Sequence, residues 1–370
     1  MKGLEVSMST NPTPTIVLSN AQNLGGLALV RSLEREDVTL FSKKRKATIA
    51  LPQEVRPLTY ADAKSLIGVA GRQKIFLPTS FEGVLQLLDE VEILKTSFLF
   101  PKDKLQFLKN LAEEESREEL FLRAGFSPRP HVRLEDEALF EEARHLGYPH
   151  LLRLSHLREN LAAFSAPYLP IDTARELASS LEKLPEEKRR GRLSAVPKDT
   201  NLYYASVFSS SSAREMAIFG VLSLSTRPEE GPSRITSRLQ HKALEEKLHN
   251  LCDLVGDVGS FFLLIDEDRR TKELSLHLAM PFYGPLTGVE MRYGLHFPLL
   301  EIASLTGVDR FRAYHRQGED VFHPTLSKKT ALPRRVRRRR SPLVLDLLGP
   351  NTLGNFLGEL SDILVAQLFS

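Results

Sequence analysis

The sequence predicts an α/β protein whose first part is a doubly wound parallel sheet and whose second part is a mixed α+β unit. From Thr15 to Ser42, a strand, a helix and a second strand follow one another within about 30 residues, which is typical of a βαβ unit. From Phe261 to Gly284, an apolar run, a charged turn and another apolar run indicate a β-hairpin. The chain has 370 residues, 42% of them hydrophobic, so we expect two or three packed domains.

Composition and charge argue against several classes of protein. The net charge is +3, from 50 basic and 47 acidic side chains, so bulk electrostatics favour neither nucleic acid nor anionic lipid as a partner. The single cysteine, Cys252, lies in an apolar stretch and cannot form an internal disulfide, which agrees with a reducing compartment. No window approaches the roughly 18 to 20 apolar residues that span a bilayer. We therefore expect a soluble cytoplasmic protein with no transmembrane segment.

The first hundred residues give the pattern of a Rossmann-like domain. Residues 1–14 are rich in Ser, Thr and Pro and predict a flexible tail. Strands and helices then alternate over residues 15–100, which favours a parallel sheet with helices on both faces. The expected strands are Thr15 to Leu18, Val38 to Ser42 and the segment KIFLPTS, and the expected helices start near Leu27, Tyr60 and Phe81.

The glycine pair Gly25-Gly26 follows the first strand and allows two interpretations. Glycines at the start of a helix let backbone N–H groups approach a phosphate. However, no GxGxxG motif is present, and basic residues from Lys43 to Lys46 stand where a ribose-binding acid would be expected. We favour a plain tight turn over a nucleotide site.

The order of elements after Phe100 is more specific than any single motif. A helix opens with Asp103 and Lys104, AGFSPRPHV leads into an extended segment, and LEDEALFEEARHLGYPHLLRLS reads as helix, turn and strand. This order resembles the start of an ATP-grasp domain, as in carbamoyl-phosphate synthetases and ATP-dependent carboxylate-amine ligases. The resemblance runs from about Thr15 to Thr306. It implies a domain preceding the ATP-grasp domain at residues 15–100, an ATP-grasp-like domain at 101–306 and a C-terminal extension at 307–370.

The resemblance implies ATP as a cofactor, two carboxylates that hold magnesium, and a small carboxylate substrate activated as an acyl-phosphate. Lys104 matches the family's first basic position, and Arg153 stands where a lysine is usual. Arg227 resembles the basic residue near the triphosphate. These three residues are the expected nucleotide phosphate contacts.

The expected magnesium site is missing from this pattern. The family's two carboxylates align with Phe262 and His277, and its Asn and Arg align with Ala279 and Pro281. The segment that should form a glycine-rich loop, SHLRENLAAFSAPY, has no glycine, and the acid and glycine of the hinge are replaced by Ser194 and Lys198. The remaining acids nearby are expected in the solvated turn of the hairpin: Glu267, Asp268 and Glu273. His277 is expected to be hydrogen-bonded or packed, with a softer metal as the alternative.

Other candidate features favour structural interpretations. His315 and His323 permit a metal hypothesis, but a surface loop is preferred. Ser209 to Ser212 are expected in a hairpin turn. Six arginines lie in the run from Arg334 to Arg340, which could bind nucleic acid or an anionic surface, but no aromatic residues interleave with it and a solvated connector is preferred. A terminal amphipathic helix, with Leu353 and Ile363 on its apolar face, is expected to dock on the core, with a dimer contact as the alternative.

Two functional hypotheses remain at this point. The first is an ATP-grasp-fold protein that has lost magnesium-dependent catalysis and acts by binding, as a regulatory or scaffolding partner of an active ATP-grasp ligase or another subunit. The second is a divergent ATP-dependent ligase that uses Lys104, Arg153 and Arg227 on phosphates. Catalytic residues are not assigned, and the aligned positions argue against magnesium as a cofactor.

Overall fold

The computed structural model describes residues 13–33, 38–43, 55–58, 66, 68–69, 71, 73–196, 199–224, 232–284, 286–290, 295–307 and 321–322. Several predicted features lie outside these residues. They are most of the helix expected from Tyr60, Lys198, Arg227, His315, His323, the Arg334 to Arg340 run and the terminal helix.

The first sheet confirms the predicted parallel arrangement. It has the order β3-β2-β1-β4-β5, and every pair in it is parallel. Because right-handed crossovers lead outward in both directions, from β1 to β2 and from β4 to β5, the two helices described for this part of the chain, α1 and α3, pack on opposite faces of the sheet. The elements are β1 Thr15–Leu18, α1 Leu24–Leu33, β2 Thr39–Lys43, β3 Val55–Leu58, β4 Lys74–Leu77, α3 Phe81–Leu94 and β5 Phe98–Leu99.

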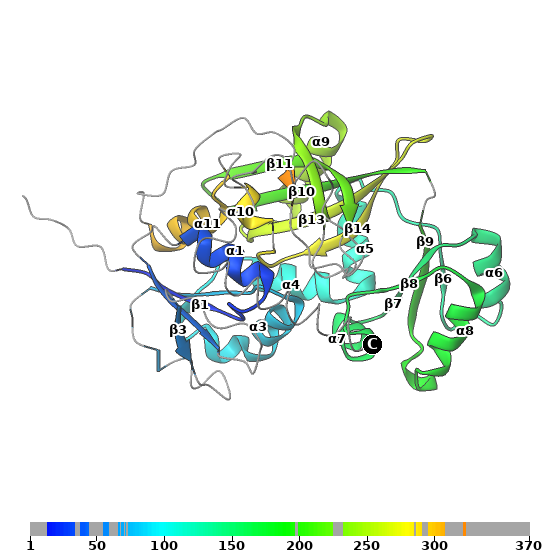
Figure 1. Ribbon diagram of the computed structural model, residues 1–370, viewed down its shortest axis with the longest axis horizontal. Coiled ribbons are helices and arrows are strands. Elements are labelled where there is room, and N and C mark those ends of the chain that lie inside the picture. The colour runs from blue at the N-terminus through cyan, green and yellow to red at the C-terminus, as the bar shows by residue number, and fades with distance from the viewer. Residues whose placement is uncertain are drawn as a thin grey trace, which may run out of the picture.

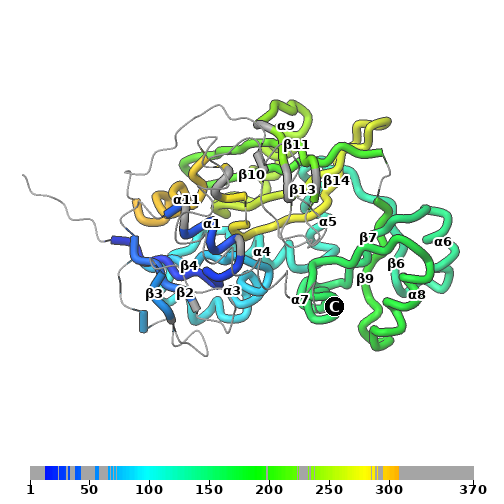
Figure 2. Tube along the Cα trace, viewed as in Figure 1, coloured from blue at the N-terminus to red at the C-terminus, as the bar shows by residue number. Residues whose placement is uncertain are grey.

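A four-stranded antiparallel sheet stands at the end of the molecule away from the parallel sheet (Figures 1 and 2). Its order is β6-β9-β7-β8, and apolar residues of α6 and α8 form a separate small core with it. The elements are β6 His131–Arg133, α6 Leu139–Leu146, β7 His150–Leu154, α7 Leu157–Phe164, β8 Leu169–Ile171, α8 Ala174–Glu182, the 3-10 turn Glu186–Lys188 and β9 Gly191–Ala195.

The third sheet contains the predicted hairpin. It is antiparallel throughout, in the order β14-β13-β10-β11-β12-β15, and the serine run lies at the β10–β11 turn as expected. Its strands are β10 Thr200–Ser209, β11 Arg214–Leu224, β12 Pro232–Leu239, β13 Gly259–Asp268, β14 Leu274–Met280 and β15 Val321–Phe322. Strand β15 corrects the expectation of a plain surface loop there, because its two residues pair with Arg234 and Ile235 of β12.

Helices cover both faces of the third sheet (Figure 1). The helices α4, Lys104–Ala112, α5, Glu114–Arg123, and α9, Lys242–Val255, pack on one face, where Cys252 is fully buried. The helices α10, Thr287–Glu290, and α11, Phe297–Thr306, lie on the other face and contact α1. One continuous core therefore joins this face to the parallel sheet. Among the described helices, none has the length and apolarity needed to cross a membrane.

Candidate functional site

Phe262 lies in an aromatic cluster at the first expected magnesium position. Its side chain projects from β13 and is 1% exposed. The ring stacks on Tyr204 with centroids 6.0 Å apart and an interplanar angle of 5°, and its neighbours Tyr283 and Phe297 approach edge-on at 6.0 and 6.3 Å. This position therefore supplies apolar packing and no oxygen ligand.

His277, at the second expected position, is held by hydrogen bonds on both ring nitrogens. Its Nδ1 lies 3.1 Å from Asp266 Oδ2, and its Nε2 lies 3.1 Å from the Tyr168 hydroxyl. Burial, together with Arg129 and Arg153, lowers the pKa of His277 well below its ordinary value, so the ring is neutral. The network fits the tautomer in which Nδ1 donates to Asp266 and Nε2 accepts from Tyr168. The prediction of a hydrogen-bonded histidine is confirmed.

A β-bulge gives His277 its unusual place in the sheet. Leu264 pairs with Leu278, whereas the next residue, Ile265, pairs with Leu276, so His277 has no register partner on β13. A bulge adds one residue to a strand and re-aims its side chain. The imidazole consequently reaches Asp266 and Tyr168 while its strand neighbours keep their pairing.

Asp266 is paired with Arg129, a residue that sequence reasoning missed. Arg129 lies between two prolines just before β6, and its Nη2 forms a buried ion pair with Asp266 Oδ2. The four residues of this network, Arg129, Tyr168, Asp266 and His277, come from distant parts of the chain. The only local signal was an arginine enclosed by prolines in a predicted turn.

The two described cations expected on nucleotide phosphates make contacts within the protein. Lys104 donates to the Ser260 carbonyl at 2.9 Å and lies 3.7 Å from Glu301 Oε1, and burial lowers its pKa against the opposing effect of Glu301. Arg153 donates to the His277 carbonyl, and its guanidinium lies 5.3 Å from the centre of the Tyr168 ring. Burial lowers the pKa of Arg153 to about 10. Both side chains are therefore engaged in holding strands β13 and β14.

The segment expected to form a phosphate-binding loop is mostly the helix α7. Asn160 of this helix accepts from Leu154 N at 2.9 Å and donates to the carbonyls of Leu154 and His156 at 3.0 Å. One buried amide thus fixes the end of β7 to the helix. With the helix in place, its interior N–H groups bond to carbonyls within the helix and are not available to wrap an anion as a glycine loop would.

The glycine pair near the start of the chain is packed against backbone. Gly25 and Gly26 lie in the first turn of α1, one element later than the predicted turn. A Cβ on Gly26 would meet the Asn20 carbonyl at 2.0 Å, and one on Gly25 would meet the Tyr283 carbonyl at 2.4 Å. Asn23 caps this helix by accepting from Gly26 N at 2.6 Å. Close packing explains both glycines, which supports the tight-turn interpretation over a phosphate site.

The prediction for Glu267 is wrong. Glu267 is 7% exposed and accepts hydrogen bonds from Asn201 Nδ2 at 2.8 Å and from the Tyr203 hydroxyl at 3.1 Å. These partners lie on β10, because β13 stays paired with that strand as far as Asp268. Glu273 is exposed in the turn, as predicted, and Asp268 is partly buried.

The residues present do not fit a magnesium ion. Magnesium takes oxygen ligands in near-octahedral geometry. The two aligned positions hold a packed phenyl ring and an imidazole whose two nitrogens are both hydrogen-bonded. Ala279 and Pro281 likewise offer no polar side chain. Within the part of the chain that the structure describes, no group of three or more His, Cys, Asp or Glu side chains is arranged for a metal.

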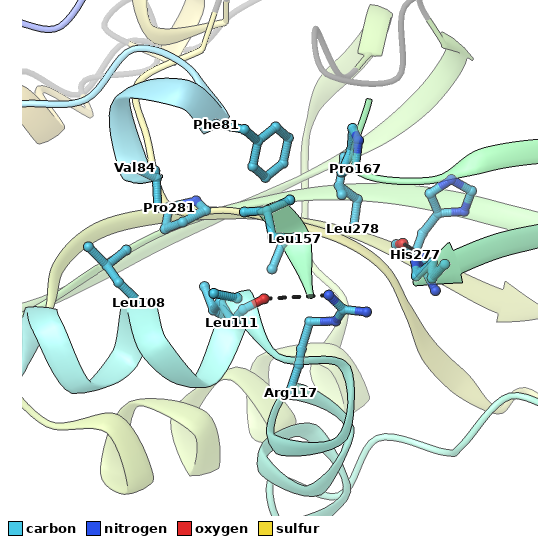
Figure 3. Close-up of a pocket in the computed structure, with 13 residues that line it drawn as sticks. Phe81, Val84, Leu108, Leu111, Arg117, Leu157, Pro167, His277, Leu278 and Pro281 are labelled. Atoms are coloured by element: carbon cyan, nitrogen blue, oxygen red, sulfur yellow. Dashed lines mark hydrogen bonds between the residues drawn. The ribbon is translucent and has the colours of Figure 1, made fainter. Parts of the chain in front are cut away.

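Two small cavities lie in this region, and Arg153 lines both. The first, of about 20 Å³, is lined by His277, Ala279 and Pro281 together with apolar residues of α3 and α4, and Arg117 donates to the Leu111 carbonyl beside it at 3.4 Å (Figure 3). The second, of about 50 Å³, is lined by four arginines. Pockets for cofactors measure roughly 300–1,000 Å³, so neither of these two cavities is large enough for ATP. A wider cleft of about 700 Å³ lies at α7, β8 and α8, and neither Phe262 nor His277 lines it.

Comparisons with known proteins agree with the fold. No protein-family profile and no curated protein sequence matches this chain. Among solved structures, carboxyaminoimidazole ribonucleotide synthase of Aspergillus clavatus in complex with ATP matches with a TM-score of 0.61 and 10% identity, over 83% of this chain and 80% of that one. An L-amino acid ligase of Bacillus licheniformis matches with a TM-score of 0.59 and 12% identity, over 84% and 79%. Biotin carboxylase of Campylobacter jejuni matches with a TM-score of 0.58 and 12% identity, over 83% and 73%. These likenesses confirm the fold expected from the order of the elements.

Proposed function

We propose that this chain, which has the ATP-grasp fold, lacks magnesium-dependent catalysis and acts by binding, as a regulatory or scaffolding protein. The observation that carries the proposal is the aromatic cluster at Phe262, where a stack with Tyr204 takes the place expected for a magnesium carboxylate. A fold carries chemistry only where its site does.

The surroundings of the second expected position support the same conclusion. His277 is neutral and saturated by Asp266 and Tyr168, so it has no free ring nitrogen for a ligand. Lys104 and Arg153 keep positive charge near the expected phosphate path, but each is engaged by a backbone carbonyl of the hairpin. ATP without magnesium remains the cofactor that the fold suggests, since the matched synthase was solved with ATP.

The proposal is tested by assaying ADP and phosphate release from the purified full-length chain with ATP, magnesium and a panel of amino acids and small carboxylates. We expect no release of ADP or phosphate above a no-protein control. We also expect no change in the thermal midpoint when magnesium is added to ATP. A magnesium ion that bound the native state would raise its stability, so an unchanged midpoint means that no such ion binds. A competent ATP-grasp ligase assayed in parallel serves as the positive control. Magnesium-dependent turnover would overturn the proposal and favour the divergent ligase.

A further inference from the structure

The cavity lined by Arg117, Arg129, Arg153 and Arg192, which we term the arginine cavity, brings four guanidinium groups together from four elements. Arg117 comes from α5, Arg129 from the segment before β6, Arg153 from β7 and Arg192 from β9. Three of these residues are less than 10% exposed as whole residues, and the Arg117 side chain is 16% exposed. Arginines are seldom buried together, because each charge must be matched.

The acids around the arginine cavity neutralise only part of this charge. Glu114 pairs with Arg117, Glu118 with Arg192 and Asp266 with Arg129. Glu115 adds a carboxylate 3.9 Å from Arg192, but its side chain is 80% exposed and is screened by solvent. Arg153 has no carboxylate partner among the described residues. Its guanidinium lies over the Tyr168 ring and donates to the His277 carbonyl.

Arg129 also has unused donors. Its Nη2 contacts Asp266, whereas its Nε and Nη1 are buried and make no hydrogen bond within the part of the chain that the structure describes. Leaving a buried charged donor unsatisfied costs several kcal/mol as an order of magnitude. Because Nη2 is held by Asp266, the free Nε–H and Nη1–H point to different sides of the guanidinium, and each can donate one charge-assisted hydrogen bond to an oxygen of a carboxylate, a phosphate or water.

Mutual repulsion among the arginines points in the same direction. Burial, and to a smaller extent the neighbouring Arg153, lowers the pKa of Arg129 to about 9. Burial, with Arg153 and Arg192, also lowers the pKa of Arg117 well below its ordinary value. A negative group inside the arginine cavity would relieve both effects.

We propose that the arginine cavity binds a small oxyanion, with the free Nε and Nη1 of Arg129 and the guanidinium of Arg153 as its main contacts. The cavity of about 50 Å³ has room for several water positions, which suits inorganic phosphate or the carboxylate of a small acid and is too small for a nucleotide. Ser127 and Ser194 also line it and supply neutral hydroxyl donors. This inference deepens the proposed function by giving it a ligand class. It rests on that function because it assigns the cavity to a small oxyanion and not to the triphosphate of a nucleotide.

The experiment is isothermal titration calorimetry of the full chain with phosphate, sulfate, acetate and malonate, against sodium chloride at matched ionic strength. We expect saturable binding of phosphate or of a carboxylate, with chloride giving none. Preference for phosphate identifies a phosphoryl ligand, and preference for acetate or malonate identifies a carboxylate. An equal, unsaturable response to every salt overturns the proposal, whatever the ATP assay shows.

Two conservative variants locate the site. Arg129→Lys keeps the charge that faces Asp266 but removes the free Nε and Nη1 donors, and Arg153→Lys keeps the charge on β7 but removes the guanidinium donors there. Each should weaken oxyanion binding about tenfold or more, since charge-assisted hydrogen bonds are lost. Arg133→Lys, on an exposed side chain of β6, is the matched control and should bind as the parent does. Unchanged affinity in both cavity variants would overturn the assignment of the site. If one variant fails to fold, the affinity of the other variant relative to the parent tests the assignment.

Discussion

A carboxylate at position 262 would face aromatic rings rather than a cation. Tyr204, Tyr283 and Phe297 surround this side chain at centroid distances near 6 Å. Such rings stabilise an apolar neighbour through contact area and edge-to-face packing. Restoring the acid alone would therefore not restore a metal site, because the surrounding residues are adapted to phenylalanine.

Phe262→Glu should lower the free energy of unfolding by about 3–5 kcal/mol or more, since it removes a buried ring and buries an unpaired charge. Urea unfolding with and without millimolar magnesium measures the effect. The control Phe140→Glu changes a side chain that is 44% exposed on α6 and should have little effect. If magnesium restored the stability of Phe262→Glu, the site would still be organised around a metal and the proposed function would be contradicted.

Individual residues also mark how far local patterns predict a site. The sequence predicted the hairpin and the hydrogen-bonded state of His277. That Phe262 and His277 stand at the family's two magnesium positions is implied by the resemblance and stays a prediction. It missed Arg129 and Tyr168, and it placed Glu267 in solvent, because each owes its environment to strands distant in sequence. Partners across a sheet depend on topology and register, which no short pattern carries.

At the scale of elements, the short helix α10 is tied to β10 through one buried acid. Glu290 is fully buried, and it accepts hydrogen bonds from the Tyr204 hydroxyl at 2.6 Å and the Ser206 hydroxyl at 2.5 Å. Its second oxygen has no partner within the described residues. Burial raises the pKa of Glu290 to about 8, although these hydrogen bonds oppose the change. The group is therefore protonated in the folded protein at neutral pH.

Glu290→Gln should consequently change how stability depends on pH. A raised folded-state pKa means that the parent's stability is full below the ordinary value of 4.5 and is lost as pH rises through about 8. The parent should lose roughly 3–6 kcal/mol more than the variant between pH 5 and 9. Urea unfolding across this range measures the difference, and Glu135→Gln, on an exposed turn, is the control. Parallel pH profiles for parent and Glu290→Gln would show that Glu290 is ionised when buried.

Most elements were predictable from periodicity, and the exceptions have physical reasons. The strand β3 was missed because Pro57 interrupts its apolar pattern, and proline is tolerated there because β3 is the edge of the parallel sheet. The helix α7 was expected as a loop because the resemblance, not the residues, suggested one. Its own sequence, LRENLAAF, is rich in helix-forming residues.

At the scale of the whole molecule, the parallel sheet and the large antiparallel sheet share one core. Residues of β1 and β4 belong to the same cluster as Tyr204, Phe262 and Phe297. Tyr283 N donates to the Pro78 carbonyl at 3.1 Å, which bonds the end of the hairpin directly to the loop after β4. The close approach of α1 to Tyr283 completes this junction, and Figure 1 shows α1 beside α10 and α11.

Gly25→Ala tests whether this junction stabilises the whole molecule. A Cβ at Gly25 would lie 2.4 Å from the Tyr283 carbonyl and 3.1 Å from the Thr79 carbonyl, and backbone atoms cannot move aside as a flexible side chain can. Overpacking of this kind costs about 1–3 kcal/mol, which for a chain of this length lowers the thermal midpoint by roughly 1–4 °C. Gly284→Ala is the matched control, because its Cβ would meet no atom within 4 Å. Calorimetry of the two variants compares them with the parent, and equal midpoints for Gly25→Ala and Gly284→Ala would show that the two sheets stabilise each other little at this contact.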